Sequence, residues 1–155
     1  LVVISVLTVL SATLILYSRT GERQITLFRD QARVVAALSR AKSLAIGTFG
    51  QADVPCSYGA NFLAPRTFRI FKDLSPDCST ADRRFSGDAE LFESFELDSQ
   101  LMFDILTLSD IVFIPPDPKI IMTPVQDQAT IVIRTNDGGS SATVRVNSAG
   151  QISTQ

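Results

Sequence analysis

The chain has 155 residues, of which 45% are hydrophobic and 19% charged, and its formal net charge is −2 at pH 7. This length corresponds to one domain with a sizeable core. The sequence has no His, which excludes Ser-His-Asp and Cys-His catalysis and His-ligated zinc. Its two cysteines are too few for a Cys₄ zinc site or an iron–sulfur cluster. The acidic balance disfavours binding through counterion release, so no nucleic-acid partner is predicted.

The most apolar part of the chain comes first. Residues 1–18 read LVVISVLTVLSATLILYS, without charge, Gly or Pro, and the first charged residue is Arg19. As a helix, this segment would be about 27 Å long, just short of a bilayer core, and we predict that it is a transmembrane or filament-core helix. A signal peptide would need a basic start and a break after the apolar run, and neither is present. The large apolar side chains predicted to form its surface are Leu1, Val2, Val3, Ile4, Val6, Leu7, Val9, Leu10, Leu14, Ile15 and Leu16.

Residues 19–49 continue the helical pattern in amphipathic form. Apolar residues recur at i, i+3, i+4 and i+7, and most charges fall off this stripe. The helix is expected to end near Gly47–Gly50, where glycines supply the cap. Gly21 is a weak point at which the helix could melt or kink on packing, or else an ordinary tolerated glycine. The residues predicted to pack the helix against the head are Phe28, Val35, Leu38 and Ala45.

Residues 50–155 are predicted to form a globular β-rich head. The periodicity changes to two after Cys56, and Asn136–Gly139 and Asn147–Gly150 are turn signals. The predicted fold class is therefore α+β: a long N-terminal helix whose apolar first half protrudes and whose amphipathic second half packs on a mostly antiparallel sheet. The predicted strands are Thr67–Phe71, Leu91–Leu97, Ile111–Ile114, Ile120–Thr123, Ala129–Arg134 and Ala142–Val146, with Gln151–Ser153 as a short closing strand.

Two segments resemble the type IV pilin superfamily, which includes the pseudopilins of type II secretion. Leu1–Leu7, LVVISVL, matches the second half of the family's N-terminal segment FTLIELLVVISVL. Leu38–Ile46, LSRAKSLAI, is similar to the helix end of H-type pseudopilins and FimT-like minor pilins. The match implies that about six residues, with the processing site, precede Leu1.

The resemblance implies a pilin-like fold and a structural role. The chain would be a subunit of a type IV pilus-like filament, held in the inner membrane with an extracytoplasmic head before assembly, and extracellular at the cell surface afterwards. Its partners would be other copies in a helical homopolymer, prepilin peptidase and the pilus assembly machinery. No enzyme activity and no cofactor are predicted. The alternatives are a pseudopilin or minor pilin and, from another class, a membrane-anchored extracytoplasmic binding module.

The remaining candidate groups have more than one interpretation. Cys56 and Cys78 are either a disulfide or two inert core thiols, and the extracytoplasmic location that the resemblance implies favours the disulfide. Acidic residues around Asp73–Glu90 could bind calcium, but a solvated acidic loop explains them more simply. The charges of helix residues 19–33 are expected to pair between neighbouring subunits. Arginines that alternate with phenylalanines over 66–85 could bind DNA, as such patches do in some pilus subunits, but an exposed strand and loop explain them more simply.

Overall fold

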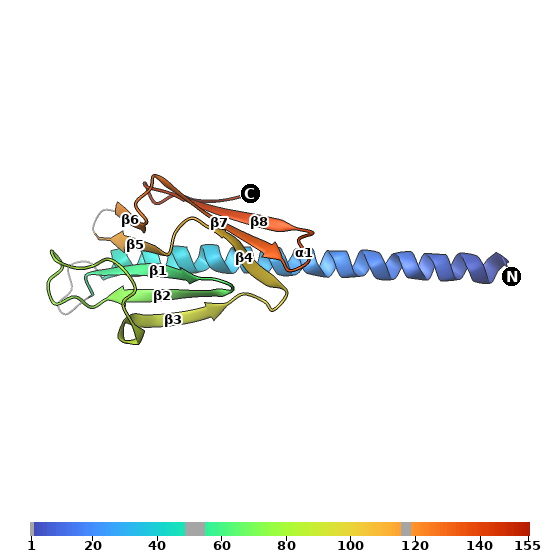
Figure 1. Cartoon of the computed structure of the whole chain (residues 1–155), viewed down its shortest axis with the longest axis horizontal. Coiled ribbons are helices and arrows are strands. Elements are labelled where there is room, and N and C mark those ends of the chain that lie inside the picture. The colour runs from blue at the N-terminus through green and yellow to red at the C-terminus, as the bar shows by residue number, and fades with distance from the viewer. Residues whose placement is uncertain (1, 49–54, 116–118) are drawn as a thin grey trace.

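The computed structural model describes residues 2–48, 55–115 and 119–155, and at 2, 12–20 and 119 it describes the backbone alone. One helix, α1 (Val2–Gly47), begins the chain. Its N-terminal part extends beyond the strands, and its C-terminal part lies alongside them (Figure 1). The head therefore has one long element against which the later strands can be arranged.

The strands form two antiparallel sheets. The five-stranded sheet has the order β3-β2-β1-β5-β6, and the four-stranded sheet has the order β4-β7-β8-β9. The strands of the first sheet are β1 (Ser57–Leu63), β2 (Thr67–Asp73), β3 (Leu91–Glu96), β5 (Asp110–Ile114) and β6 (Lys119–Thr123). Those of the second are β4 (Leu101–Leu106), β7 (Gln128–Thr135), β8 (Ser141–Asn147) and β9 (Ile152–Thr154). A short 3₁₀ helix, η1 (Asp88–Glu90), precedes β3.

The predicted fold class is wrong. The described residues form nine strands in two sheets, so the molecule is mostly antiparallel β and not a long helix laid on a single sheet. Within the part of the chain that the structure describes, no helix is long and apolar enough to cross a membrane. The second half of α1 contacts strands of both sheets, because both present an apolar face toward it.

The core lies between α1 and the inner faces of the two sheets. One helix face, with Leu27, Val34 and Leu38, is fully buried there, and Ala41 and Ala45 continue it. Val35 is partly buried against the same core. Phe28 is 58% exposed, so its predicted packing against the head is wrong. The helical stripe was wide enough to include residues on the solvent side, and periodicity alone does not say which edge of a stripe is covered.

The outer face of the five-stranded sheet has a small core of its own. Gly59 of β1 pairs with Phe71 of β2 and Val112 of β5, and both of these side chains are buried. Phe85, from the segment between β2 and β3, meets the Phe71 ring at 5.7 Å between centroids. A Cβ at Gly59 would lie 2.6 Å from both the Ile111 carbonyl oxygen and Phe71 Cζ. The central strand therefore requires glycine at this position.

The predicted strands are present with small shifts, and two further strands were missed. β1 (SYGANFL) contains Gly, Ala and Asn, which are poor strand formers, yet it is the middle strand of its sheet. β4 has a register shift at Phe103/Ile105, which disturbs the alternation in its sequence. The two turn signals connect β7 to β8 and β8 to β9, with left-handed Gly138 and Gly150.

Candidate functional site

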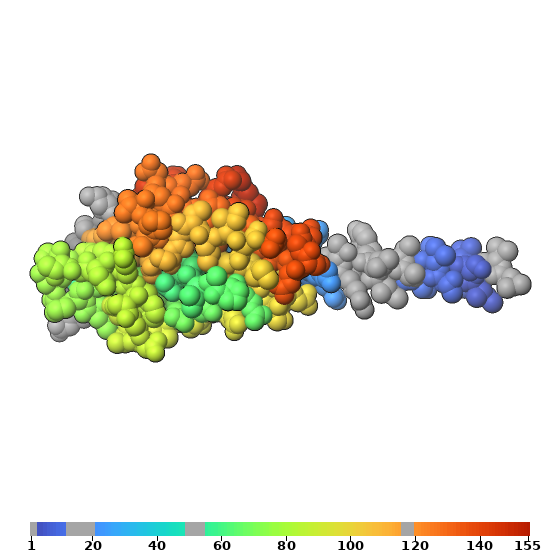
Figure 2. Space-filling view, viewed as in Figure 1, coloured from blue at the N-terminus to red at the C-terminus, as the bar shows by residue number. Residues whose placement is uncertain are grey.

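The first turns of α1 carry a large exposed apolar surface. We call this the apolar helix surface; its residues are Val3, Ile4, Val6, Leu7, Val9 and Leu10, and each is 52–70% exposed. Figure 2 shows residues 3–11, in dark blue, clear of the head. Of the other predicted surface residues, Leu1 lies outside the described chain, and the side chains of Val2, Leu14, Ile15 and Leu16 are not described.

The apolar helix surface covers more than one side of the helix. At about 100° per residue, its six side chains occupy an arc of roughly 220°. Ser5 and Thr8 lie on the remaining side, where the Thr8 hydroxyl donates to the Ser5 carbonyl oxygen at 2.8 Å. A helix in a single groove buries a narrower stripe. Neighbours on several sides are needed to remove this surface from water.

Polar clamps hold the second half of α1 to the head. Asp30 is fully buried, and its carboxylate accepts the Asp98 N–H at 2.6 Å and Arg33 Nη1 at 3.1 Å. The next residue, Gln31, is also bonded to the head: its Nε2 donates to the carbonyl oxygens of Thr143, at 2.9 Å, and Gln155, at 3.3 Å. A buried charge without partners would be costly, so these bonds set the position of the helix against both sheets.

Several of the helix charges pair within the chain; the predicted pairing between subunits concerns the assembled state and stays a prediction. Arg23 pairs with Asp137 of the β7–β8 turn, and Arg29 Nη2 lies 3.3 Å from Asp98 Oδ2. Arg33 pairs with Asp30 in the same helix. The side chain of Arg19 is not described. Among the described helix charges in residues 19–33, Glu22 makes no ion pair in the chain.

A cleft of about 620 Å³ lies where the free part of α1 leaves the head; we call it the base cleft. The Thr135 hydroxyl, the Gly139 N–H and Arg23 together hold the pKa of Asp137 below its ordinary value. Ile25, on the helix wall, is 71% exposed. The lining residues are Glu22, Arg23, Ile25, Thr26, Gln100, Thr135, Asn136 and Asp137. No motif in the sequence indicated this cleft, because Arg23 and Asp137, which meet across it, are 114 residues apart in the chain.

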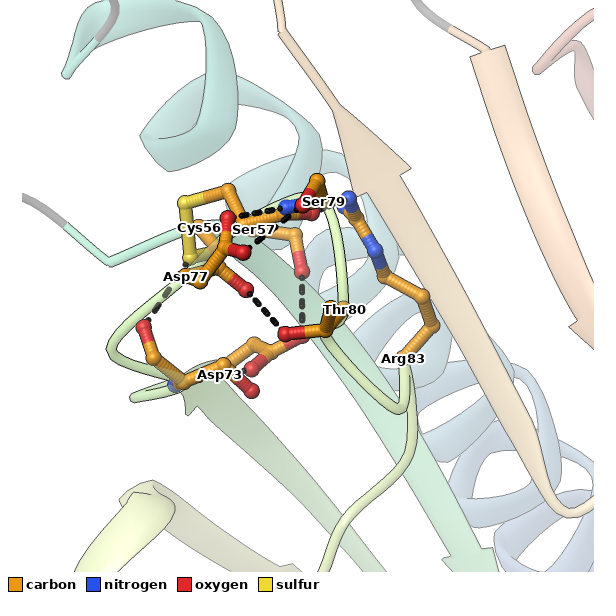
Figure 3. Close-up of a disulfide and its surroundings, with 9 residues drawn as sticks. Cys56, Ser57, Asp73, Asp77, Ser79, Thr80 and Arg83 are labelled. Atoms are coloured by element: carbon orange, nitrogen blue, oxygen red, sulfur yellow. Dashed lines mark hydrogen bonds between the residues drawn. A yellow bond between two sulfur atoms is a disulfide. The ribbon is translucent and has the colours of Figure 1, made fainter.

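The predicted disulfide is confirmed. Cys56 and Cys78 are bonded, with Cα atoms 5.0 Å apart and a sequence separation of 22 (Figure 3). Next to it, Asp77 accepts the Ser79 N–H at 2.9 Å and the Ser79 hydroxyl at 2.8 Å, which lowers the pKa of Asp77. Arg83 donates to the Cys78 carbonyl oxygen at 2.7 Å. The start of β1 and the segment after β2 are thereby joined.

Several of the acidic and aromatic residues that the sequence singled out are buried or bonded within the chain. In the described residues, no group of three or more His, Cys, Asp or Glu side chains could hold a metal ion. Asp73 is buried and accepts from Ser57 and from the Ser75 N–H. Phe68 and Phe71 are buried, so these rings are not available to stack on bases.

Gly21 lies inside α1, which is continuous from residue 2 to 47. The helix is therefore not melted there in the single chain, and a Cβ at this glycine would meet nothing within 4 Å. The prediction of a melt or kink on packing concerns the assembled state and stays a prediction.

The comparisons with known proteins add no relative. A scan of protein-family models, a search of curated proteins and a search of solved structures each found no match to this chain.

Proposed function

We propose that this chain is the structural subunit of a type IV pilus-like filament that polymerises through the N-terminal part of α1. The observation that carries the proposal is the apolar helix surface, six large side chains that are more than half exposed and lie away from the head. Isolated exposed apolar residues are common, but a contiguous exposed patch marks an interaction site.

The breadth of the surface favours several copies of the same helix as its partner. Full burial of each large apolar side chain stabilises an assembly by about 1.5–3 kcal/mol. An arc of roughly 220° at about 100° per residue would be covered when like helices surround one another. Ser5 and Thr8 are small, which lets helices approach closely. The resemblance of LVVISVL to pilin N-termini supports the same conclusion.

The proposal extends to the state before assembly and to location. Residues 1–18 would sit in the inner membrane with the head outside the cytoplasm, and the filament would be at the cell surface. The support is the uncharged run of the sequence and its resemblance to pilins. The disulfide agrees with an oxidising compartment. Prepilin peptidase and the assembly machinery are the partners proposed by that resemblance.

The test is electron microscopy of material sheared from cells that produce the chain. Val6→Asp places a charge in the apolar helix surface and is expected to abolish filaments. Val125→Asp is the matched control, because Val125 is 92% exposed on the head and the same change there should leave filaments intact. Normal filaments from the Val6→Asp chain would contradict the proposal.

The same images separate the alternatives. Abundant filaments labelled along their length by an antibody to the chain support a repeating subunit. Sparse label on filaments of another protein would indicate a minor pilin or pseudopilin, which the Leu38–Ile46 segment also resembles. A chain found in the membrane and never in a fibre would be a binding module.

A further inference from the structure

We propose that neighbouring copies also make a specific head-to-tail contact, in which Arg84 of one copy lies beside Glu22 in the base cleft of the next. The inference rests on the proposed function for the idea that copies are stacked. It adds a second interface, with its two partners named, at a surface formed by the folded head.

The two surfaces lie at opposite ends of the head. Figure 2 shows the segment between β2 and β3, residues 74–90, at the end farthest from residues 3–11. We call this segment the far-end loop. The base cleft lies at the other end, where α1 leaves the strands (Figure 1). A contact between two different surfaces at opposite ends repeats from copy to copy without closing, which is the geometry of a filament.

Of the two described carboxylates that line the base cleft, only that of Glu22 is free to pair with a neighbouring copy. Arg23 and Asp137 neutralise each other across the cleft, and the Asn136 side chain donates to the Ser99 carbonyl oxygen at 2.9 Å. Glu22 is exposed and makes no ion pair in the described chain. The exposed Ile25 beside it offers apolar area to the stem of a long cationic side chain.

Of the two described arginines in the far-end loop, only Arg84 is free to pair with a neighbouring copy. Arg83 donates to the Cys78 carbonyl oxygen, and Arg69 of β2 stacks over the Phe85 ring at 5.3 Å. The Arg84 side chain is exposed, and in the described chain it makes no hydrogen bond or ion pair. The same loop carries Leu74, which is 47% exposed. The loop therefore has a cation and an apolar side chain to match the carboxylate and the apolar side chain of the cleft.

The loop is held rigid before any contact is made. The disulfide fixes Cys78, the Phe85 N–H donates to Asp110 at 3.3 Å, and the Ser86 N–H donates to buried Glu90 at 2.8 Å. A loop that is already ordered loses little conformational entropy on docking.

The experiment is a charge exchange in the full chain, purified in mild detergent and followed by sedimentation velocity and electron microscopy. Glu22→Arg alone and Arg84→Glu alone should each raise the concentration at half-association about fivefold, as expected for one ion pair. The double variant should return to within about twofold of wild type, because the pair is restored with reversed sign. Arg145→Glu, a reversal on the outer face of β8, is the control and should have no effect.

The outcomes distinguish this inference from the proposed function. Filaments that are insensitive to both reversals, or a double variant that does not recover, would overturn the contact and leave the filament proposal standing. Association that depends on Glu22 and Arg84 without any filament would support the contact and overturn the filament proposal. No association of the wild-type chain at any concentration would overturn both.

Discussion

At the scale of single residues, Gly59 illustrates how one atom decides local packing. The Phe71 ring and the Ile111 carbonyl oxygen lie where a Cβ would be. Gly59→Ala is therefore expected to lower the free energy of unfolding by about 2 kcal/mol, as overpacking of a tight core does. Gly21→Ala is the matched control, because its Cβ meets nothing and alanine favours the helix by about 1 kcal/mol. Urea unfolding measures the stability of both variants. Equal stability of the two would contradict the conclusion that a Cβ cannot be accommodated at Gly59.

Asp77 gives a second prediction at this scale. Its pKa lies below the ordinary value of 3.8, first because it accepts the Ser79 N–H and then because it accepts the Ser79 hydroxyl. The stabilisation of this turn is present above pH 3.8 and is lost as the pH falls through the lower, folded-state pKa. Ser79→Ala should raise the pKa of Asp77 part of the way to 3.8, since the N–H donor remains. An NMR titration of the carboxyl carbon tests this, and an unchanged pKa would contradict it.

At the scale of the elements, α1 has two apolar faces with different roles. Leu38 is fully buried between the sheets, whereas Phe28 is mostly exposed. Leu38→Ala should lower the free energy of unfolding by about 3 kcal/mol, through lost burial and a cavity. Phe28→Ala should change it by less than about 0.5 kcal/mol. Thermal or urea unfolding of both variants measures these changes. A large decrease in the free energy of unfolding for Phe28→Ala would show that Phe28 does pack against the head.

Prediction from sequence succeeded where one element determines the outcome. The Asn136–Gly139 turn, the last strands and the helix follow from local residue types and periodicity. It failed where distant residues decide. The sequence of β1 is typical of a loop, and only its contact with Phe71 explains why Gly59 lies in a strand. The burial of Asp30 depends on a backbone N–H 68 residues later in the chain. The base cleft could not be predicted either, because its walls come from distant parts of the chain. The apolar surface of residues 3–10 could be predicted, because the sequence there is almost entirely apolar.

At the scale of the whole molecule, the disulfide restrains the unfolded chain. A closed loop with a separation of 22 residues contributes about 3 kcal/mol in the chain-entropy treatment. Cys56→Ser with Cys78→Ser should therefore lower the free energy of unfolding by about that amount while both sheets stay formed. Circular dichroism during urea unfolding measures the loss, and reduced wild-type protein should match the double variant. Loss of the sheets in native buffer would contradict the conclusion that the disulfide acts mainly by restraining the unfolded chain.

The hydrogen bonds from α1 to the four-stranded sheet and to the turn after β8 also have a consequence for the order of folding. Gln31 and Lys42 reach backbone oxygens of Thr143 and Gly150, at separations of 112 and 108 residues. Contacts so far apart in the chain form slowly, because a long loop must close first. The helix is synthesised first, yet its site in the core is completed only by the last strands. During that interval the side chains of its core face, such as Leu38, have no packing partners, so the incomplete chain is prone to aggregation.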